Sequence, residues 1–136
     1  MAGKFNIEFK GHYRYVNIKS IPEISGIYGV STCKFNETAK TVSLNKLVYI
    51  GESSNVNERI NSHEKLKDWE KHLQTGEVLC FNTAVVSGDD RFNVEASLIY
   101  AHKPPVNTEY ISHNAYPGTT IKSTGRNGLI KSQVSV

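Results

Sequence analysis

The sequence contains little cysteine and no long apolar run, and both absences exclude classes of protein. Cys33 and Cys80 are the only cysteines among 136 residues, and neither belongs to a CxxC pair or a paired His/Cys spacing. A disulfide framework and a structural zinc site are therefore not expected, and both thiols are predicted to be reduced. Nowhere does the chain offer the roughly 18 consecutive apolar residues that span a bilayer. We expect a soluble, cytoplasmic protein with no membrane partner.

Internal repeats and low-complexity segments are also absent, and the length of 136 residues suits one domain over residues 1–136. The content of 38% hydrophobic and 21% charged residues is in the range of globular proteins. The net charge of +3 is modest but uneven, because Glu109 is the only acid from His102 to Val136. An acidic polymer is a plausible partner of this segment, but charge alone does not distinguish such a partner from solvent.

Alternating and apolar runs predict the strands. Phe5 to Phe9 alternate with polar residues, which predicts strand structure in the N-terminal arm. Residues 26–31 and 47–50 are two further strands, and the turn formers and polar residues at 33–45 predict an antiparallel hairpin with a rather long connection. The apolar run at 78–86 fits a buried central strand.

Two helices are predicted between and after these strands. Ser54 or Asn55 can cap the first helix, with Glu58 placed as in a capping box, and that helix extends to Leu73 with a possible break. The second runs from residue 92 to 102 and ends before two prolines. The remainder shows no helical period and only a short strand at 119–121. Alternation of strands with helices indicates a mixed α/β fold.

Glu95 is the first candidate for a functional residue. It lies one helical turn before Leu98 and Ile99, on the face expected to meet the sheet. A carboxylate at a buried edge needs a partner, so Glu95 is either half of a structural ion pair or a cation ligand. The residue alone favours the ion pair.

Other candidates lie on the first helix and on the hairpin. Arg59 and His63 are four residues apart and are expected to project together, where they can grip a phosphate or simply face solvent. Their neighbours are assigned to a solvated helix face, namely Lys65, Lys67, Asp68, Glu70 and Lys71. Tyr28 and Tyr49 lie on adjacent predicted strands, and each alone is ordinary strand packing. The glycines beside them would let a bulky ligand approach the backbone, at Gly26, Gly29 and Gly51.

Together these residues form an ordered series. The series is Gly26-Ile27-Tyr28, Tyr49-Ile50-Gly51, Ser53, Asn55, Val56, Arg59, His63, Glu95 and Asn107. It closely resembles the GIY-YIG nuclease family, and chance is a poor explanation for the whole series. The resemblance covers residues 24–107 and implies a central three-stranded antiparallel sheet flanked by helices. Residues 1–23 would be an arm with extra strands, and residues 108–136 an irregular tail that contacts DNA.

The resemblance also implies catalytic roles. Tyr28 would act as general base on the attacking water, and Glu95 would hold one divalent cation, Mg²⁺ or Mn²⁺, beside the scissile phosphate. Arg59 would stabilise the transition state. Because a tyrosine with a pKa near 10 is a poor base at neutral pH, its proton must be drawn away by the cation, by Arg59 or by an acceptor such as His63.

The remaining residues of the series have supporting roles. Tyr49 would hydrogen-bond a phosphate oxygen or the nucleophile, and Asn107 would fix the local backbone or support Glu95. We expect DNA contacts at Lys46, Ser53, Asn55, Lys122 and Arg126. Sequence specificity is expected from the insert at residues 33–45, the N-terminal arm or the tail.

The resemblance predicts a metal-dependent DNA endonuclease that nicks or cuts both strands at specific sites, as a monomer or a homodimer. The 21-residue step from Tyr28 to Tyr49 is longer than in compact family members, which indicates a hairpin insertion. The chain is expected to be a stand-alone enzyme of restriction, homing, phage or mobile-element type, acting in a bacterial or phage-infected cell. The alternatives are a catalytically silent DNA-binding module with the same fold and an unrelated protein-interaction domain.

Overall fold

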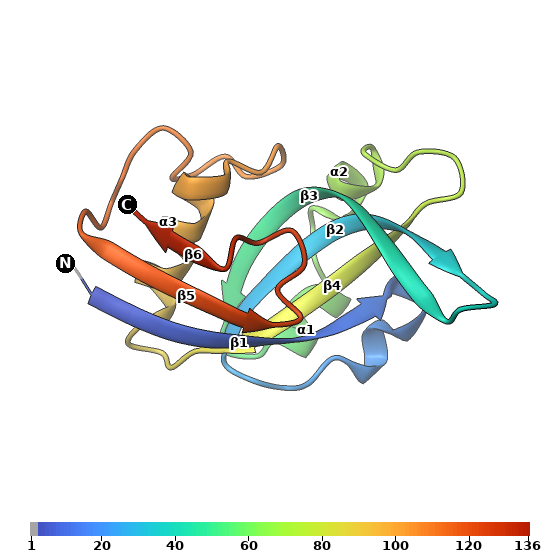
Figure 1. Cartoon of the computed structure of the whole chain (residues 1–136), viewed down its shortest axis with the longest axis horizontal. Coiled ribbons are helices and arrows are strands. Elements are labelled where there is room, and N and C mark those ends of the chain that lie inside the picture. The colour runs from blue at the N-terminus through green and yellow to red at the C-terminus, as the bar shows by residue number, and fades with distance from the viewer. Residues whose placement is uncertain (1–2) are drawn as a thin grey trace.

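The computed structural model describes residues 3–136, so the first two residues of the predicted arm lie outside the described residues. Within that range, six strands form one sheet in the order β3-β2-β4-β1-β5-β6 (Figure 1). The strands are β1 (Gly3–Arg14), β2 (Gly26–Asn36), β3 (Thr41–Ser53), β4 (Val78–Val85), β5 (Thr119–Gly125) and β6 (Gln133–Ser135). The helices are a 3-10 helix (Tyr15–Ser20), α1 (Val56–Asn61), α2 (Leu66–Glu70) and α3 (Arg91–His102). The predicted mixed α/β class is confirmed.

The sheet is larger than the predicted three strands. β3, β2 and β4 are antiparallel neighbours, but they form only half of it. β1, expected in the N-terminal arm, pairs with β4 and also runs parallel to β5. The prediction of an irregular tail is wrong, because β5 and β6 extend the sheet. β5 pairs with a strand from the opposite end of the chain, and local sequence patterns carry no signal for such a contact.

The β2–β3 hairpin has a short turn, so the predicted long connection is wrong. The two strands pair from Gly26 opposite Ser53 to Asn36 opposite Thr41, which leaves only residues 37–40 for the turn. Val42 and Leu44 are half-buried between exposed neighbours. That alternation of period two is typical of a strand, and it extends both strands through the predicted insertion.

The predicted first helix is two short ones. Asn55 caps α1, since its Oδ1 accepts a hydrogen bond of 3.2 Å from the Glu58 backbone N–H, as the capping pattern predicts. Ser62 then leaves the helical conformation (φ −132°, ψ 28°). His63 therefore lies in the link between α1 and α2, and not on the same helix as Arg59. Within residues 3–136, no helix has the length and apolar character needed to cross a bilayer.

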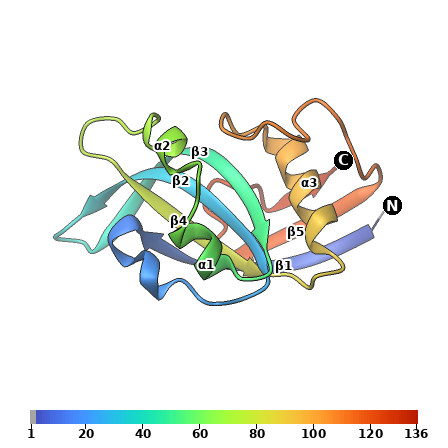
Figure 2. The ribbon, with the colours of Figure 1, turned by 180° about the vertical axis from the view of Figure 1, so that it is seen from behind.

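The two faces of the sheet carry separate hydrophobic clusters. Neighbouring strand residues point to opposite faces, so Ile27 joins the cluster that packs against α3, whereas Tyr28 joins the cluster that contains Val56 of α1 and Trp69 of α2. Figure 2 shows α1 and α2 on one side of the curved strand β3 and α3 on the other side. The candidate site lies where these two packing regions meet along β3.

Cys33 and Cys80 form a disulfide, so the prediction of two reduced thiols is wrong. Both residues are fully buried. They lie on the paired strands β2 and β4, where Cys80 stands opposite Ser31, and their Cα atoms are 6.2 Å apart. The spacing of 47 residues gives no signal for this pairing, which depends on strand register.

Candidate active site

The outer edge of β3 positions the segment that follows α3. β3 is the last strand of the sheet, so its outward backbone groups have no strand partner. The Val106 N–H donates to the Val48 carbonyl at 3.0 Å. The Asn107 side chain accepts the Ile50 N–H at 3.0 Å and donates to the Ile50 carbonyl at 2.9 Å. Asn107 is thereby fixed to the backbone beside Tyr49, as one of its two predicted roles requires.

A cavity of about 280 Å³ lies along this edge and gathers half of the predicted catalytic residues. Tyr49 comes from β3, Glu95 from α3 and Asn107 from the segment after α3. Further lining residues are Glu52, Lys65, Phe92, Ile99, Thr108, Glu109 and Tyr110. The cavity is therefore lined by three carboxylates, two phenols and one cation.

Glu95 makes no ion pair with any residue in the described part of the chain. The ion pair of this region is formed instead by Glu52, whose carboxylate accepts from Arg91 Nε at 2.7 Å. Burial, together with the nearby charges of Glu52 and Glu109, raises the pKa of Glu95 to about 7, against the effect of a backbone hydrogen bond from Glu52. Glu95 is thus anchored to β3 with its carboxylate short of positive charge.

Tyr28 and His63 form a buried hydrogen bond, with 2.8 Å between the hydroxyl and Nε2. His63 Nδ1 accepts the Lys65 backbone N–H at 3.1 Å. Since a neutral imidazole has one donor and one acceptor nitrogen, we assign the ring proton to Nε2. Burial and the charge of Arg59 lower the pKa of His63 to about 4, which keeps the ring neutral. His63 therefore donates to Tyr28, which differs from the predicted acceptor role.

Tyr28 and Tyr49 differ in their exposure to solvent. Tyr49 is half-buried and lines the cavity, whereas Tyr28 is only 1% exposed and packs behind it, with ring centroids 6.2 Å apart. Burial raises the pKa of Tyr28 and raises that of Tyr49 to about 12, while Arg59 lowers both. An added Cβ on Gly51 would overlap the Tyr28 ring. Gly51 therefore makes room for Tyr28, and not for a ligand as predicted.

Trp69 supports this cluster, and its role had no signal in the sequence beyond its being the single tryptophan. Its side chain is fully buried. Its ring centroid lies 4.4 Å from that of His63 and 5.5 Å from that of Tyr49. Trp69 thus fixes the imidazole that donates to Tyr28.

Two charged residues that follow His63 lie at the site without having been predicted there. Lys65 was expected on a solvated helix face, and Glu64 had no predicted role. Lys65 lines the cavity, although its neighbours suggested a solvated helix face. Glu64 accepts two hydrogen bonds from Arg59, at 2.7 and 2.8 Å. The only feature of the sequence that could have indicated Glu64 and Lys65 as site residues is their position directly after His63.

Comparison with known proteins decides the family. The model of the GIY-YIG catalytic domain matches residues 27–110, which span the hairpin, α1, α2, β4, α3 and Asn107. The chain belongs to the GIY-YIG family. Domains of this family are nuclease domains, and DNA is the implied substrate.

One curated relative of this GIY-YIG chain is UvrABC system protein C of Thermosipho africanus (strain TCF52B), which is 32% identical over 71 residues. That stretch is 52% of this chain but only 13% of the relative, so the chain spans a small part of that protein. No solved structure matches the chain.

The predicted DNA-binding residues do not gather at the GIY-YIG site. Ser53 and Asn55 engage each other and the start of α1, as the Ser53 hydroxyl donates to the Asn55 carbonyl at 3.0 Å. Lys46 is exposed, with Nζ 3.4 Å from His72 Nδ1. Lys122 lies on the exposed side of β5, and Arg126 follows β5; neither lines the catalytic cavity.

Two carboxylates of the cavity, Glu95 and Glu109, have no ion-pair partner among residues 3–136, and of these only Glu95 is half-buried. Within residues 3–136, no three His, Cys, Asp or Glu side chains are grouped closely enough to hold a metal ion. Glu52 is engaged by Arg91, which leaves Glu95 as the anchored acid. Mg²⁺ commonly keeps several waters and takes phosphate oxygens, so the half-buried Glu95 carboxylate fits it when DNA is bound.

Proposed function

We propose that the chain is a metal-dependent DNA endonuclease that hydrolyses phosphodiester bonds at specific sites. The observation that carries the proposal is the cavity shared by Tyr49, Glu95 and Asn107, with the Tyr28–His63 pair directly behind Tyr49. These residues come from five separate segments of the chain, namely β2, β3, the link between α1 and α2, α3 and the segment after α3. A purely structural role gives no reason to gather a raised-pKa carboxylate and Tyr49 at one opening, with a second phenol directly behind them.

The scissile phosphate would be held by the cations of the site. Arg59 supplies a planar guanidinium that suits two phosphate oxygens, and Lys65 supplies a point charge from the cavity wall. The Arg59 charge lies near both tyrosines, because it opposes the rise that burial causes in the pKa values of Tyr28 and Tyr49. The extra negative charge that develops on phosphorus would be stabilised there.

Tyr28 would first release its own proton to solvent, and the phenolate would then take a proton from the attacking water. In that step the water oxygen bonds to phosphorus, a P–O ester bond breaks, and the leaving oxygen takes a proton from solvent. The His63 Nε2–H stabilises the phenolate form of Tyr28, and Arg59 does the same through its charge, while burial opposes it. Tyr49, the more exposed of the two, would hydrogen-bond the water or a phosphate oxygen.

Glu95 would hold one Mg²⁺ or Mn²⁺ ion, and Asn107 would keep the β3 backbone in place beside it. When bound, the ion would supply positive charge next to the phosphate and lower the pKa of a bound water. The raised pKa of Glu95 supports this role, because a cation relieves the repulsion from Glu52 and Glu109.

The biological type we propose is a restriction, phage or mobile-element nuclease, as a monomer or a homodimer. A single site of this kind cuts one strand, so double-strand cleavage requires two sites or two successive cuts. The form of the product therefore tests the number of sites that act together.

Plasmid cleavage tests the proposed function. Supercoiled plasmid is incubated with wild-type protein and with Glu95→Ala, in Mg²⁺ and in EDTA, with Glu77→Gln as a variant in the loop before β4. Metal-dependent open circles indicate a nickase, and linear product indicates double-strand cutting; both should disappear only in Glu95→Ala. Retained DNA binding without cleavage of varied plasmid and phage DNA would replace the proposal with the silent DNA-binding module.

A further inference from the structure

Phe92 is an exposed aromatic residue in the wall of the catalytic cavity. It lies on α3, three residues before Glu95, and both residues line the cavity. Residues three apart share one face of a helix, with about 5–6 Å between their Cβ atoms. The Phe92 ring therefore lies next to the carboxylate that would hold the cation.

The exposure of this ring sets it apart from most aromatic side chains of the chain. Phe92 is 53% exposed, and among the Phe, Tyr and Trp side chains of residues 3–136 only Tyr15, at 41%, is also exposed. Phe92 belongs to neither hydrophobic cluster of the described chain. A single exposed apolar residue needs no explanation by itself. This one, however, shares a cavity with the proposed cation ligand.

The backbone that carries Phe92 is held firmly although its ring is exposed. Arg91 Nε donates to Glu52 at 2.7 Å, and Arg91 Nη1 donates to Ser25 Oγ at 2.8 Å. These bonds join the first turn of α3 to β3 and to the segment before β2. A ring on a fixed backbone loses little conformational entropy when it binds a ligand.

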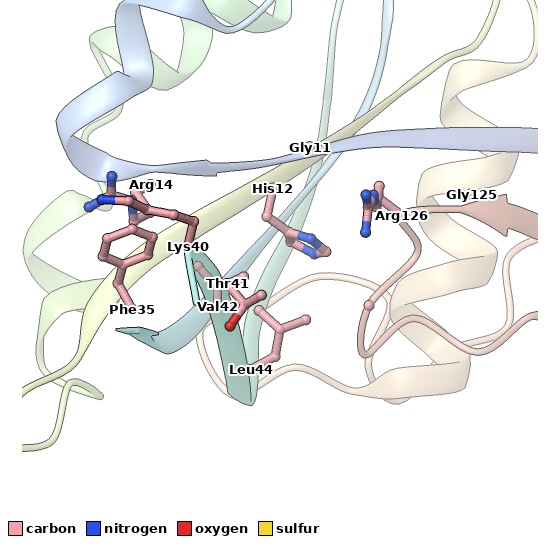
Figure 3. A pocket seen from close by; sticks show the side chains of 11 residues that line it. Gly11, His12, Arg14, Phe35, Lys40, Thr41, Val42, Leu44, Gly125 and Arg126 are labelled. Carbon is pink, nitrogen blue, oxygen red and sulfur yellow. The ribbon is translucent and has the colours of Figure 1, made fainter. Parts of the chain in front are cut away.

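The phenylalanine of a larger cavity is, in contrast, already covered by the protein. That cavity, of about 550 Å³, is bounded by the end of β1, the β2–β3 hairpin and the loop after β5 (Figure 3). The Arg14 guanidinium lies over the Phe35 ring there, 3.6 Å from its centroid. The Arg91 guanidinium is 5.9 Å from the Phe92 centroid. Phe92 is thus the more open ring and the one beside the catalytic residues.

A ring beside the scissile phosphate can stack on a base only if that base leaves the duplex stack. Neighbouring bases cover each other's faces, so the side chain must enter between two base pairs or receive an extruded base. Phenylalanine is one of the apolar residues that proteins insert between base steps. An apolar ring gains little from a phosphate or a hydrated sugar, whereas every base has a flat face on which it can stack.

We propose that Phe92 enters the base stack next to the scissile phosphate and stacks on the base that it displaces, which opens the step beside the cut. The proposal rests on the proposed function for the duplex and for the place of the scissile phosphate at Glu95. Because the step must be unstacked, a duplex in which one base pair is already lost should bind more tightly.

Binding to mismatched DNA tests this wedge without cleavage. Two labelled duplexes of one sequence, one fully paired and one with a central T·T mismatch, are titrated by fluorescence anisotropy in EDTA. The proteins are wild type, Phe92→Ala, Phe92→Trp, which keeps an aromatic ring, and Tyr15→Ala, which removes an exposed ring outside the catalytic cavity. Since Phe92 packs in neither hydrophobic cluster, its variants should unfold at the wild-type temperature.

We expect wild type and Phe92→Trp to bind the mismatched duplex at least about fivefold more tightly than the paired one, because a step that has lost a base pair costs less to open. Phe92→Ala should bind the two duplexes equally. Tyr15→Ala should keep the wild-type preference.

Three results would overturn the proposal. Equal binding of the two duplexes by wild type would show that no step is opened, and a preference retained in Phe92→Ala would assign the opening to another group. An equal loss of affinity for both duplexes in Phe92→Ala would assign the ring to a sugar or groove contact. Plasmid cleavage is scored separately. No cleavage with a Phe92-dependent preference removes only the nuclease proposal, whereas cleavage without that preference removes only the wedge.

Discussion

The guanidinium of Arg59 is held by Glu64 through two parallel hydrogen bonds, from Nη1 at 2.7 Å and from Nη2 at 2.8 Å. Two carboxylate oxygens occupy the positions that two phosphate oxygens would take. The side-chain hydrogen bond to Arg59 lowers the pKa of Glu64 to about 2, so the pair is charged at any working pH. A phosphate that binds Arg59 must therefore displace Glu64.

Removing the negative charge of Glu64 should strengthen DNA binding. Since the pair is exposed, with 64% of the Glu64 side chain accessible, its loss is worth at most about 1 kcal/mol. We expect Glu64→Gln to lower the DNA concentration at half-maximal cleavage by up to about fivefold. Asp68→Asn, which loses an exposed acid paired with Lys71, is the charge-matched control. Weaker binding in Glu64→Gln would mean that Glu64 orients Arg59 for catalysis.

The Tyr28 hydroxyl should matter more for rate than for binding. If Tyr28 takes the proton of the attacking water, Tyr28→Phe should lower the single-turnover cleavage rate by about 10²–10⁴-fold with little change in DNA affinity. Tyr49→Phe should cost less. Tyr100→Phe, on α3 but outside the cavity, is the control. The reverse ranking of Tyr28 and Tyr49 would assign the proton transfer to the residue that lines the cavity.

The free energy of unfolding should depend on pH through the ionisation of Glu95. The pKa of Glu95 is about 7 in the folded protein, above its ordinary value of 4.5, so folding favours the protonated form. Its contribution to stability is present below pH 4.5 and is lost as the pH rises through 7. In EDTA, Glu95→Gln should therefore be more stable than wild type at pH 8, by on the order of 1–3 kcal/mol, and equal to it near pH 4.

The cleavage rate should also depend on the ionisation of Glu95, but it should increase over the pH range in which stability decreases. Only ionised Glu95 can hold a cation, so the wild-type rate at limiting Mg²⁺ should rise as the pH increases through 7. Saturating Mg²⁺ should move that rise to lower pH. Urea unfolding and single-turnover kinetics across pH 4–9 measure both effects, and a flat rate profile at limiting Mg²⁺ would contradict a ligand role for Glu95.

Asn107 should be needed for stability as well as for activity. Its side chain is buried and satisfies both the N–H and the carbonyl of Ile50. Asn107→Ala leaves these groups unpaired, and we expect a loss of about 1–3 kcal/mol in the free energy of unfolding. Asn36→Ala, which removes an exposed turn hydrogen bond to the Ala39 N–H, should cost less than about 1 kcal/mol. Equal losses would show that the Ile50 backbone finds other partners.

The Cys33–Cys80 disulfide should contribute measurably to stability. It closes a loop with a sequence separation of 47 residues, so reduction should lower the free energy of unfolding by about 2–4 kcal/mol. Urea unfolding with and without reductant measures the change. Thiol titration of the denatured, unreduced protein should find no free cysteine, and two free thiols would restore the prediction from the sequence.

The catalytic series was readable from the sequence because its residues lie on strongly patterned elements. Tyr28 and Tyr49 lie on adjacent strands, and Glu95 lies on a helix that ends before two prolines, as local pattern predicts. Asn55 caps α1 for the same reason. Periodicity and capping depend on near neighbours, which any single sequence displays.

The family, the mixed α/β class and the candidate catalytic residues could therefore be predicted from the sequence alone. The six-stranded sheet, the disulfide and the direction of the hydrogen bond from His63 to Tyr28 could be established only from the three-dimensional structure. The ion pair of Glu64 and the cavity position of Lys65 likewise required the three-dimensional structure. Each of these depends on strand register or on contacts between distant segments, and local sequence patterns carry no signal for which distant groups will meet.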